Sequence, residues 1–226
     1  MSKQIIVISA HPDDEILGAG GTLIRHRNNG DEIHWLIATN IFESQGFSQE
    51  RITSRQEEIG EVASKLRMQV HKLEYPTMRL TSRDLLTLVP KISKIFLEVK
   101  PEVIYVLNRS DAHSDHRILF DAVMACTKSF RYPFIREVLM YECVSETEFA
   151  PILPEKVFQP NVFIDISANL EEKLELMRIY KSELEDHPFP RSEKNIRALA
   201  TYRGATCGVE CAEAFQLLKS YRFERL

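Results

Sequence analysis

Two clusters of histidine and aspartate in this chain could bind a metal ion and move protons. The first is AHPDDE at residues 10–15, and the second is NRSDAHSDH at residues 108–116. A catalytic zinc ion typically takes three protein ligands from His, Asp and Glu and keeps one position for water, whose pKa falls to about 7. Either cluster alone could instead cap a helix, because Asp and Ser favour the first turn. Two such clusters brought to one place would predict a metal site.

The spacing assigns a role to each side chain. His11 and Asp14 are three residues apart in one turn, so both can reach one ion, and His116 would complete a His/Asp/His set. Asp13 would then lie beside the metal, placed to accept a proton from the bound water as general base.

The second cluster could supply an oxyanion donor. His113 and His116 are three residues apart, so at a helix start both rings face the same space. With His116 on the metal, His113 can stabilise an oxyanion or protonate a leaving amine. Asp115 is expected to hydrogen-bond the His113 ring and hold it charged and oriented. A metal, a base, an oxyanion donor and water together predict hydrolysis of an acyl bond.

The elements that must position these residues follow from hydrophobic patterning. Short β-branched runs alternate with helical segments, which predicts a single-domain, Rossmann-like α/β fold with a mostly parallel sheet and helices on both faces. The expected strands are Gln4–Ser9, Ile33–Ala38, Val70–Tyr75 and Val103–Leu107, and the helices are Ile16–Asn29, Glu50–Leu66, Arg83–Val99 and about Asp115–Lys128. The two clusters follow the first and fourth strands, so they would meet at the carboxyl edge of the sheet, where ligands bind in such folds.

The second half of the chain is expected to complete the same domain. Strands are predicted at Val138–Tyr141 and in NVFIDIS at residues 161–167, and helices near Ala168–Leu184, Glu193–Thr201 and Val209–Lys219. No repeat or composition shift marks a second domain, so residues 1–226 are predicted to form one.

Composition and the order of charges along the chain argue against nucleic-acid binding, secretion and membrane insertion. Twenty-nine basic and 33 acidic residues give a net charge of −4, without the basic excess that nucleic-acid binding needs. Charge interrupts the N-terminal apolar run too early for a signal peptide or a membrane span. Four cysteines without a CxxC pair fit a reduced, cytoplasmic protein.

The glycines of GAGGT after the first strand raise the alternative of a dinucleotide site. The spacing fails the G-x-G-x-x-G fingerprint, because Leu23 stands where the third glycine should be. The small residues are better explained by close packing of a helix against its neighbours.

AHPDDE, followed by GGT and later by HSDH, resembles the PIG-L/LmbE-like metal-dependent deacetylases. RQEE at residues 55–58 opens a helix as the family's Arg-x-x-Glu segment does, and RGATCGVECAEAF at residues 203–215 is similar to the bacillithiol-pathway members. The family more often has Pro where this chain has Ser114, but His113, Asp115 and His116 keep their spacing.

The resemblance implies a zinc-dependent hydrolase that removes the acetyl group from an N-acetylglucosaminyl conjugate, a small-molecule substrate. It implies His11, Asp14 and His116 as metal ligands, Asp13 as general base, His113 and Asp115 as the charged histidine and its partner, and Arg55 as a substrate-binding residue. Fe²⁺, Mn²⁺ or Co²⁺ would also suit these ligands. The sequence leaves open the group attached to the sugar and the oligomeric state, although related enzymes often assemble as homo-oligomers.

Two alternatives remain open from the sequence. One is a metal-dependent amidase that cleaves a larger acyl group from a sugar or thiol conjugate. The other is a non-catalytic module that binds a nucleotide sugar through a degenerate site.

Overall fold

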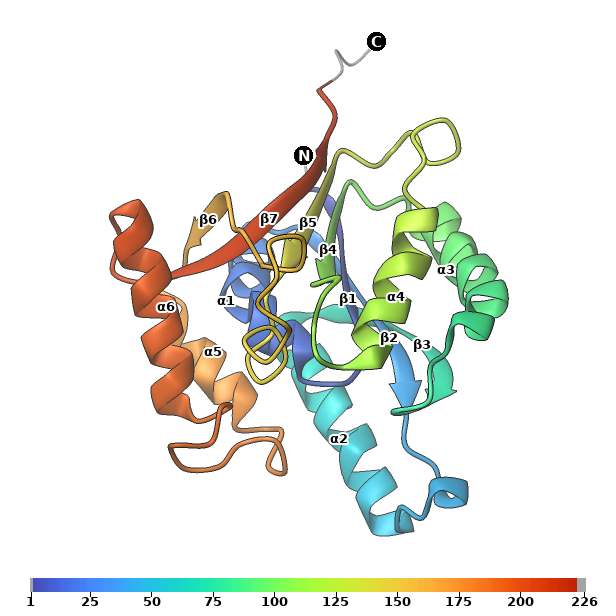
Figure 1. The fold of residues 1–226 in the computed structure, drawn as a ribbon, viewed down its shortest axis with the longest axis horizontal. Coiled ribbons are helices and arrows are strands. Elements are labelled where there is room, and N and C mark those ends of the chain that lie inside the picture. Colours follow the sequence, from blue (N-terminus) through green and yellow to red (C-terminus); the bar gives the residue numbers. More distant parts are fainter. Residues whose placement is uncertain (1, 223–226) are drawn as a thin grey trace.

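A seven-stranded sheet runs through the computed structural model, which describes residues 2–222 (Figure 1). The strands are β1 Gln4–Ser9, β2 Glu32–Asn40, β3 Met68–Pro76, β4 Val103–Leu107, β5 Glu137–Tyr141, β6 Val162–Asp165 and β7 Ala212–Ser220. Their spatial order is β3-β2-β1-β4-β5-β7-β6. The first five strands pair in parallel, and β7 runs antiparallel to both β5 and β6. The predicted mostly parallel α/β fold is confirmed.

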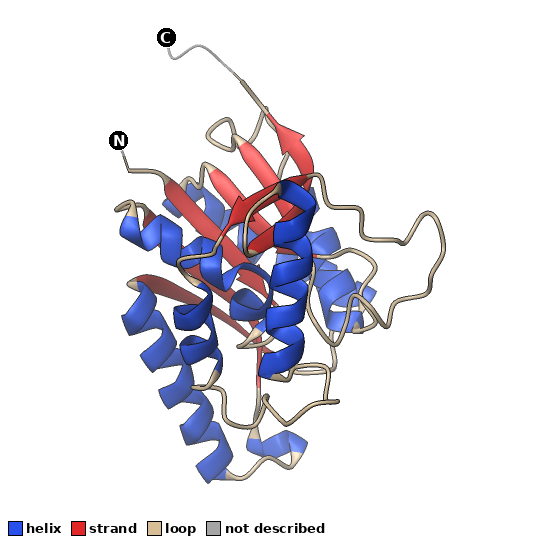
Figure 2. Cartoon of the chain, turned by 90° about the vertical axis from the view of Figure 1, so that its left-hand side faces the viewer, coloured by secondary structure: helices blue, strands red, loops and turns tan. Residues whose placement is uncertain are grey.

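Helices cover both faces of this sheet (Figure 2). They are α1 Asp14–Asn28, α2 Gln49–Leu66, α3 Leu85–Val99, α4 Ser114–Ala125, α5 Leu170–Met177 and α6 Glu193–Cys207, with short 3₁₀ turns at Glu43–Gln45 and Ser82–Asp84. Helix α1 contacts α2 and α5, whereas α3 packs on α4. Within residues 2–222, no helix is long and apolar enough to cross a membrane.

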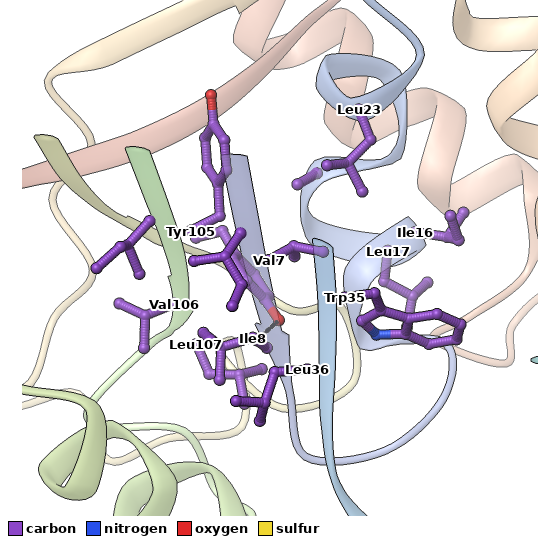
Figure 3. Close-up of a cluster of buried hydrophobic side chains, with 14 of the residues drawn as sticks. Val7, Ile8, Ile16, Leu17, Leu23, Trp35, Leu36, Tyr105, Val106 and Leu107 are labelled. Carbon is purple, nitrogen blue, oxygen red and sulfur yellow. Dashed lines mark hydrogen bonds between the residues drawn. The ribbon is translucent and has the colours of Figure 1, made fainter. Parts of the chain in front are cut away.

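The central strands are buried on both faces, as their continuous apolar sequences predict. Val7 and Ile8 of β1 and Val106 and Leu107 of β4 are fully buried in the core (Figure 3), and Trp35 of β2 pairs with Val7 from the other side of β1. Burying one such aliphatic side chain contributes about 1.5–3 kcal/mol to folding. These strands therefore form a rigid base for the segments that follow them.

Strand β1 lies between β2 and β4, so the order of the strands reverses beside it. The chain leaves β1 into α1 and then β2, while β4 lies on the opposite side of β1. Loops at such a switch point diverge and leave a crevice at the carboxyl edge of the sheet. Both His/Asp clusters lie there, because one follows β1 and the other follows β4.

The predicted helix at Val209–Lys219 is wrong, because Ala212–Ser220 forms strand β7. Gly208, with φ of 82°, ends α6 in the left-handed conformation, and the chain then enters the sheet between β5 and β6. Two neighbouring strands supply backbone partners, and this tertiary pairing overrides local helix propensity. The helix predicted at Ala168–Leu184 is also shorter, since α5 covers only Leu170–Met177.

Helix α1 approaches its neighbours so closely that it needs glycine, as the sequence predicts. A Cβ on Gly18 would lie 2.1 Å from the Tyr141 ring, and one on Gly21 would lie 2.7 Å from Ile166. The Tyr141 ring cannot yield easily, because it is fully buried and its hydroxyl donates to the carbonyl of Ile8 at 2.7 Å. Close packing therefore fixes the position of the segment before α1.

We expect Gly18→Ala to lower the free energy of unfolding by about 1–3 kcal/mol, because the added methyl overpacks the Tyr141 contact. Gly60 in α2 is the matched control, since a Cβ there would meet no atom of the described residues within 4 Å. Gly60→Ala should be neutral or stabilise the protein by up to about 1 kcal/mol through helix propensity. Urea unfolding of the two variants checks this, and equal effects would contradict the packing argument.

Candidate active site

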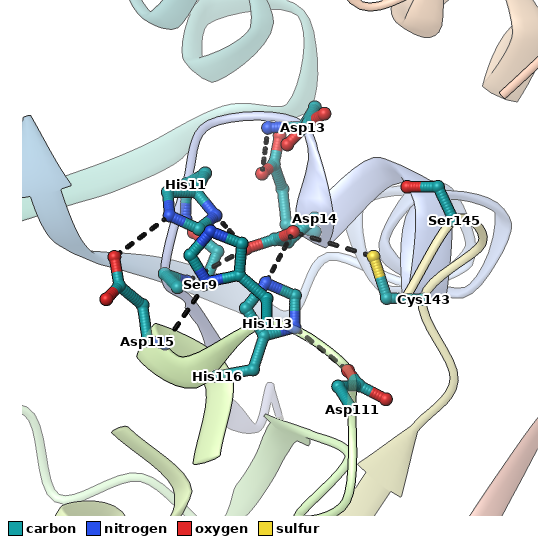
Figure 4. Close-up of polar contacts among 12 residues, drawn as sticks. Ser9, His11, Asp13, Asp14, Asp111, His113, Asp115, His116, Cys143 and Ser145 are labelled. Atoms are coloured by element: carbon teal, nitrogen blue, oxygen red, sulfur yellow. Dashed lines mark hydrogen bonds and ion pairs between the residues drawn. The ribbon is translucent and has the colours of Figure 1, made fainter. Parts of the chain in front are cut away.

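The two clusters meet at the carboxyl edge of the sheet, as predicted (Figure 4). The ring centroids of His11 and His113 lie 4.5 Å apart, those of His11 and His116 5.5 Å, and those of His113 and His116 5.3 Å. They border a cavity of about 450 Å³, which is also lined by Asp13, Asp14, Arg55, Cys143 and Glu183 among others. This size falls in the range of small-ligand pockets.

Nε2 of His116 is the candidate metal-binding atom with the clearest support. Its Nδ1 lies 2.9 Å from Oδ2 of Asp111, so the carboxylate fixes the proton on Nδ1. Its Nε2 is buried and has no hydrogen-bond partner among the described residues, although it lies 3.3 Å from Oδ1 of Asp14. A buried ring nitrogen that faces a carboxylate oxygen across this distance is an arrangement in which both groups can bind one divalent cation.

His11 is oriented in the same way by a different carboxylate. Its Nε2 lies 3.2 Å from Oδ2 of Asp115, which leaves Nδ1 facing Oδ2 of Asp14 at 3.8 Å. Asp115 also accepts the backbone N–H groups of Met78 and Leu80, at 2.7 and 3.0 Å. The prediction that the Asp115 carboxylate holds the His113 ring is therefore corrected: this carboxylate holds His11.

The surroundings of His113 disfavour the charged ring that the sequence predicts. Burial and the neighbouring rings of His11 and His116 lower its pKa to about 4. Its Nδ1 accepts the backbone N–H of Asp115 at 3.1 Å, so the ring proton lies on Nε2. A neutral ring of this tautomer can donate a hydrogen bond to an oxyanion but does not carry a proton to give away.

The surroundings of Asp14 favour the charged form of its carboxyl. Burial opposes its charged form, but the nearby rings of His116 and His11 hold its pKa far below the usual range. Its Oδ2 accepts the backbone N–H groups of Ala10 and His11, at 2.9 and 2.8 Å. The thiol of Cys143 lies 3.5 Å from Oδ1.

Two sets of three possible metal ligands can be formed, and both include His11 and His116. Ligand atoms of the three histidines all lie within 4.8 Å of one another, so the described residues include a group able to hold a metal ion. The alternative third ligand is Asp14. The hydrogen bond from the Asp115 N–H disfavours His113, because it occupies Nδ1 and leaves the proton on Nε2. The charge and position of Asp14 fit the role better.

Asp13 combines burial with an unusual backbone. The residue is 6% exposed and lines the cavity, and its φ of 131° lies outside the regions that most residues adopt. Burial raises the pKa of its carboxyl well above the ordinary value, and the charges of Asp14 and Glu183 add to this effect. A raised pKa is typical of carboxylates that exchange protons near neutral pH.

Arg55 lines the cavity but is already engaged. Its Nη1 donates to the carbonyl of Pro12 at 2.8 Å, its Nη2 contacts Glu183, and its Nε lies 3.2 Å from Glu58. Glu183 also binds Arg51 and Arg191, so three guanidinium groups converge on one carboxylate. Its role in binding substrate stays a prediction.

Sequence reasoning missed several residues of the site. Asp111 lies inside the second cluster, and its position five residues before His116 was the only available signal. Cys143, Glu183 and Arg191 come from segments without a motif, and only the fold brings them to the cavity.

We expect Asp111→Asn to weaken the affinity for a divalent metal by about 10- to 100-fold, because the ring of His116 would lose its orienting carboxylate. Asp31→Asn is the matched control, since Asp31 binds Nδ1 of His26 at 2.7 Å, away from the cavity. Metal titration against a competing chelator compares the two variants. Equal affinities would show that the contact between Asp111 and His116 does not support metal binding.

The chain is similar in sequence and in structure to diacetylchitobiose deacetylases. A diacetylchitobiose deacetylase from Thermococcus kodakarensis is 23% identical over 96% of this chain and 83% of its own length. The N,N'-diacetylchitobiose deacetylase structure from Pyrococcus horikoshii matches with a TM-score of 0.77 and 20% identity, covering 96% of this chain and 84% of that one.

The fold also occurs with a different chemistry. A 4-carboxy-2-hydroxymuconate hydratase from Pseudomonas putida matches with a TM-score of 0.70 and 19% identity, over 99% of both chains. A family model described as PIG-L, GlcNAc-PI de-N-acetylase, matches residues 6–127, which include both His/Asp clusters. Because this match spans more than half of the chain, the protein belongs to the PIG-L family.

Proposed function

We propose that this protein is a metal-dependent hydrolase that removes the N-acetyl group from an N-acetylated amino sugar, and that residues 1–226 form one catalytic domain. The observation that carries the proposal is the buried Nε2 of His116, which has no hydrogen-bond partner within residues 2–222 and faces Oδ1 of Asp14 at 3.3 Å, at the wall of a cavity that Asp13 also lines. Family membership and the deacetylase names of the relatives support it.

His11, Asp14 and His116 would hold the metal. We propose Zn²⁺, and Fe²⁺, Mn²⁺ or Co²⁺ would also fit two imidazole nitrogens and a carboxylate. When bound, such an ion polarises the acetyl carbonyl and lowers the pKa of water. Asp111 and Asp115 lie at the opposite ring nitrogens of the two histidines, where they would hold the ring protons when the ion is bound.

Asp13 would carry the proton taken from water, and His113 would stabilise the negative charge of the oxyanion. Asp13 accepts a proton from water while the water oxygen attacks the acetyl carbon. The Nε2–H of His113 donates a hydrogen bond to the oxyanion that forms. The C–N bond then breaks, and Asp13 passes its proton to the leaving amine. Acetic acid, which ionises to acetate in water, and the free amino sugar are the products, so one water is consumed and Asp13 returns to its starting state.

The site supports an amino-sugar substrate of small size. The cavity of about 450 Å³ is polar near His11 and His116, whereas Leu17, Ile41, Phe47 and Met78 provide apolar walls for a sugar ring. An amidase that releases a larger acyl group remains the alternative enzyme. The homo-oligomer, the cytoplasmic location and the bacillithiol-like branch stay predictions.

The test is amine release from a panel of N-acetylglucosamine conjugates, with added zinc and with a chelator. We expect chelator-sensitive release of acetate from at least one conjugate. Asp13→Asn should lower kcat by about 10²-fold or more while the bound metal is retained, because the general base is lost. Release of a larger acid would favour the amidase. A fully active Asp13→Asn variant would contradict the mechanism, and absence of both release and metal would favour a binding module.

The pH dependence should show an acid limb set by Asp13. Asp13 accepts a proton only as the carboxylate, so kcat/KM falls as pH drops through its pKa. Burial raises this pKa well above the ordinary 3.8, so we expect the limb to lie well above pH 3.8. A pH–rate profile measured alongside the bound metal checks this. A limb that follows metal loss alone would assign it to the ligands instead.

A further inference from the structure

The backbone of Asp13 lies in a conformation that needs outside support. Its φ of 131° and ψ of −31° fall where a residue with a Cβ is disfavoured. Such geometry persists only where surrounding groups hold it, and it is concentrated at functional sites. The supporting groups around Asp13 are therefore informative.

One peptide group, between Pro12 and Asp13, is held at both ends. Its carbonyl accepts Nη1 of Arg55 at 2.8 Å, and its N–H donates to Oε2 of Glu15 at 3.1 Å. The carbonyl of Asp13 accepts the N–H groups of Ile16 and Leu17, at 3.0 and 2.9 Å, in the first turn of α1. Rotation of this peptide would break bonds on both of its sides, so its orientation is tightly restrained.

Tyr180, which is far from Glu15 in the sequence, holds the Glu15 side chain in place. The hydroxyl of Tyr180 donates to Oε1 of Glu15 at 2.6 Å, and both side chains are fully buried. Tyr180 lies just beyond the end of α5 and reaches across 165 positions of sequence to Glu15. Neither Glu15 nor Tyr180 lines the cavity, so neither can touch a substrate there.

We propose that Arg55, Glu15 and Tyr180 form a clamp, here called the Asp13 clamp, that positions the general base. Arg55 holds the carbonyl side of the Pro12–Asp13 peptide, and Glu15, braced by Tyr180, holds the N–H side. The three are positioning residues that act through Asp13. This inference rests on the proposed function for the catalytic role of Asp13, whereas the conformation that the clamp maintains can be observed directly.

The kinetic test removes the hydroxyl that braces Glu15. Tyr180→Phe should lower kcat by about tenfold, which corresponds to one lost hydrogen bond, and should leave KM and bound metal within about twofold. Tyr105→Phe is the matched control, because Tyr105 is also buried and its hydroxyl binds Nε2 of His26 at 2.9 Å, away from the cavity. Equal losses of kcat in both variants would reduce the effect to general destabilisation and overturn the clamp.

A double-mutant cycle separates positioning from a structural role. If Tyr180 acts through the carboxylate of Asp13, then Tyr180→Phe should change residual kcat by less than about twofold when Asp13 is already Asn. A further tenfold loss in that background would show that Tyr180 acts by another route. Glu15→Leu keeps a similar size and removes both acceptor oxygens, so it should reproduce the kcat loss of Tyr180→Phe with KM unchanged.

Crystal structures supply a readout that does not depend on activity. The unsubstituted protein should show Asp13 with φ near 131°, and Glu15→Leu or Tyr180→Phe should show the Pro12–Asp13 peptide rotated or in two orientations. If the unsubstituted enzyme releases no amine from any conjugate, the proposed function fails while this comparison still decides the clamp. An unchanged peptide in both variants would overturn it.

Discussion

The concentration of buried negative charge at the carboxyl edge of the sheet is the constraint on which the site depends. Four carboxylates converge there, from Asp13, Asp14, Asp111 and Asp115, and all are nearly or fully buried. Unpaired charges in such surroundings would be costly, so each needs a hydrogen-bond donor or an opposite charge. Two are paired with imidazole rings, and Asp14 takes two backbone N–H groups beside a lone pair of His116. This arrangement is neutralised best by a cation.

The fold makes that concentration possible by bringing two loops together at a switch point. Strands β1 and β4 are neighbours, so the loops that follow them open at the same edge although more than 90 residues separate them. Glycines in α1 allow the segment after β1 to pack against Tyr141 and Ile166. Asp13 and Asp14 follow β1 after a short connection, so the rigid sheet limits their movement.

The same scaffold is compatible with more than one reaction, so function has to be argued from the site. A hydratase and a deacetylase both share this fold with the chain. The three histidines of this site have different partners. Carboxylates lie at Nε2 of His11 and Nδ1 of His116, so the other nitrogen of each ring faces Asp14, whereas a backbone N–H occupies Nδ1 of His113. The proposed roles, metal binding by two rings and an oxyanion contact from the third, rest on this difference.

The sequence alone determined the parallel core, the two His/Asp clusters at strand ends and the meeting of these clusters at one edge of the sheet. These features depend on local pattern, because apolar runs define buried strands and a residue after a strand must lie at the edge of the sheet. Only the tertiary structure decided that Asp115 pairs with His11, that Asp111 pairs with His116, and that Ala212–Ser220 is a strand. Asp115 and His11 are 104 positions apart, and spacing along the chain cannot rank partners that meet only after folding. A hydrogen bond is decided by where both groups lie in space, whereas sequence periodicity reports only which face or edge each group occupies.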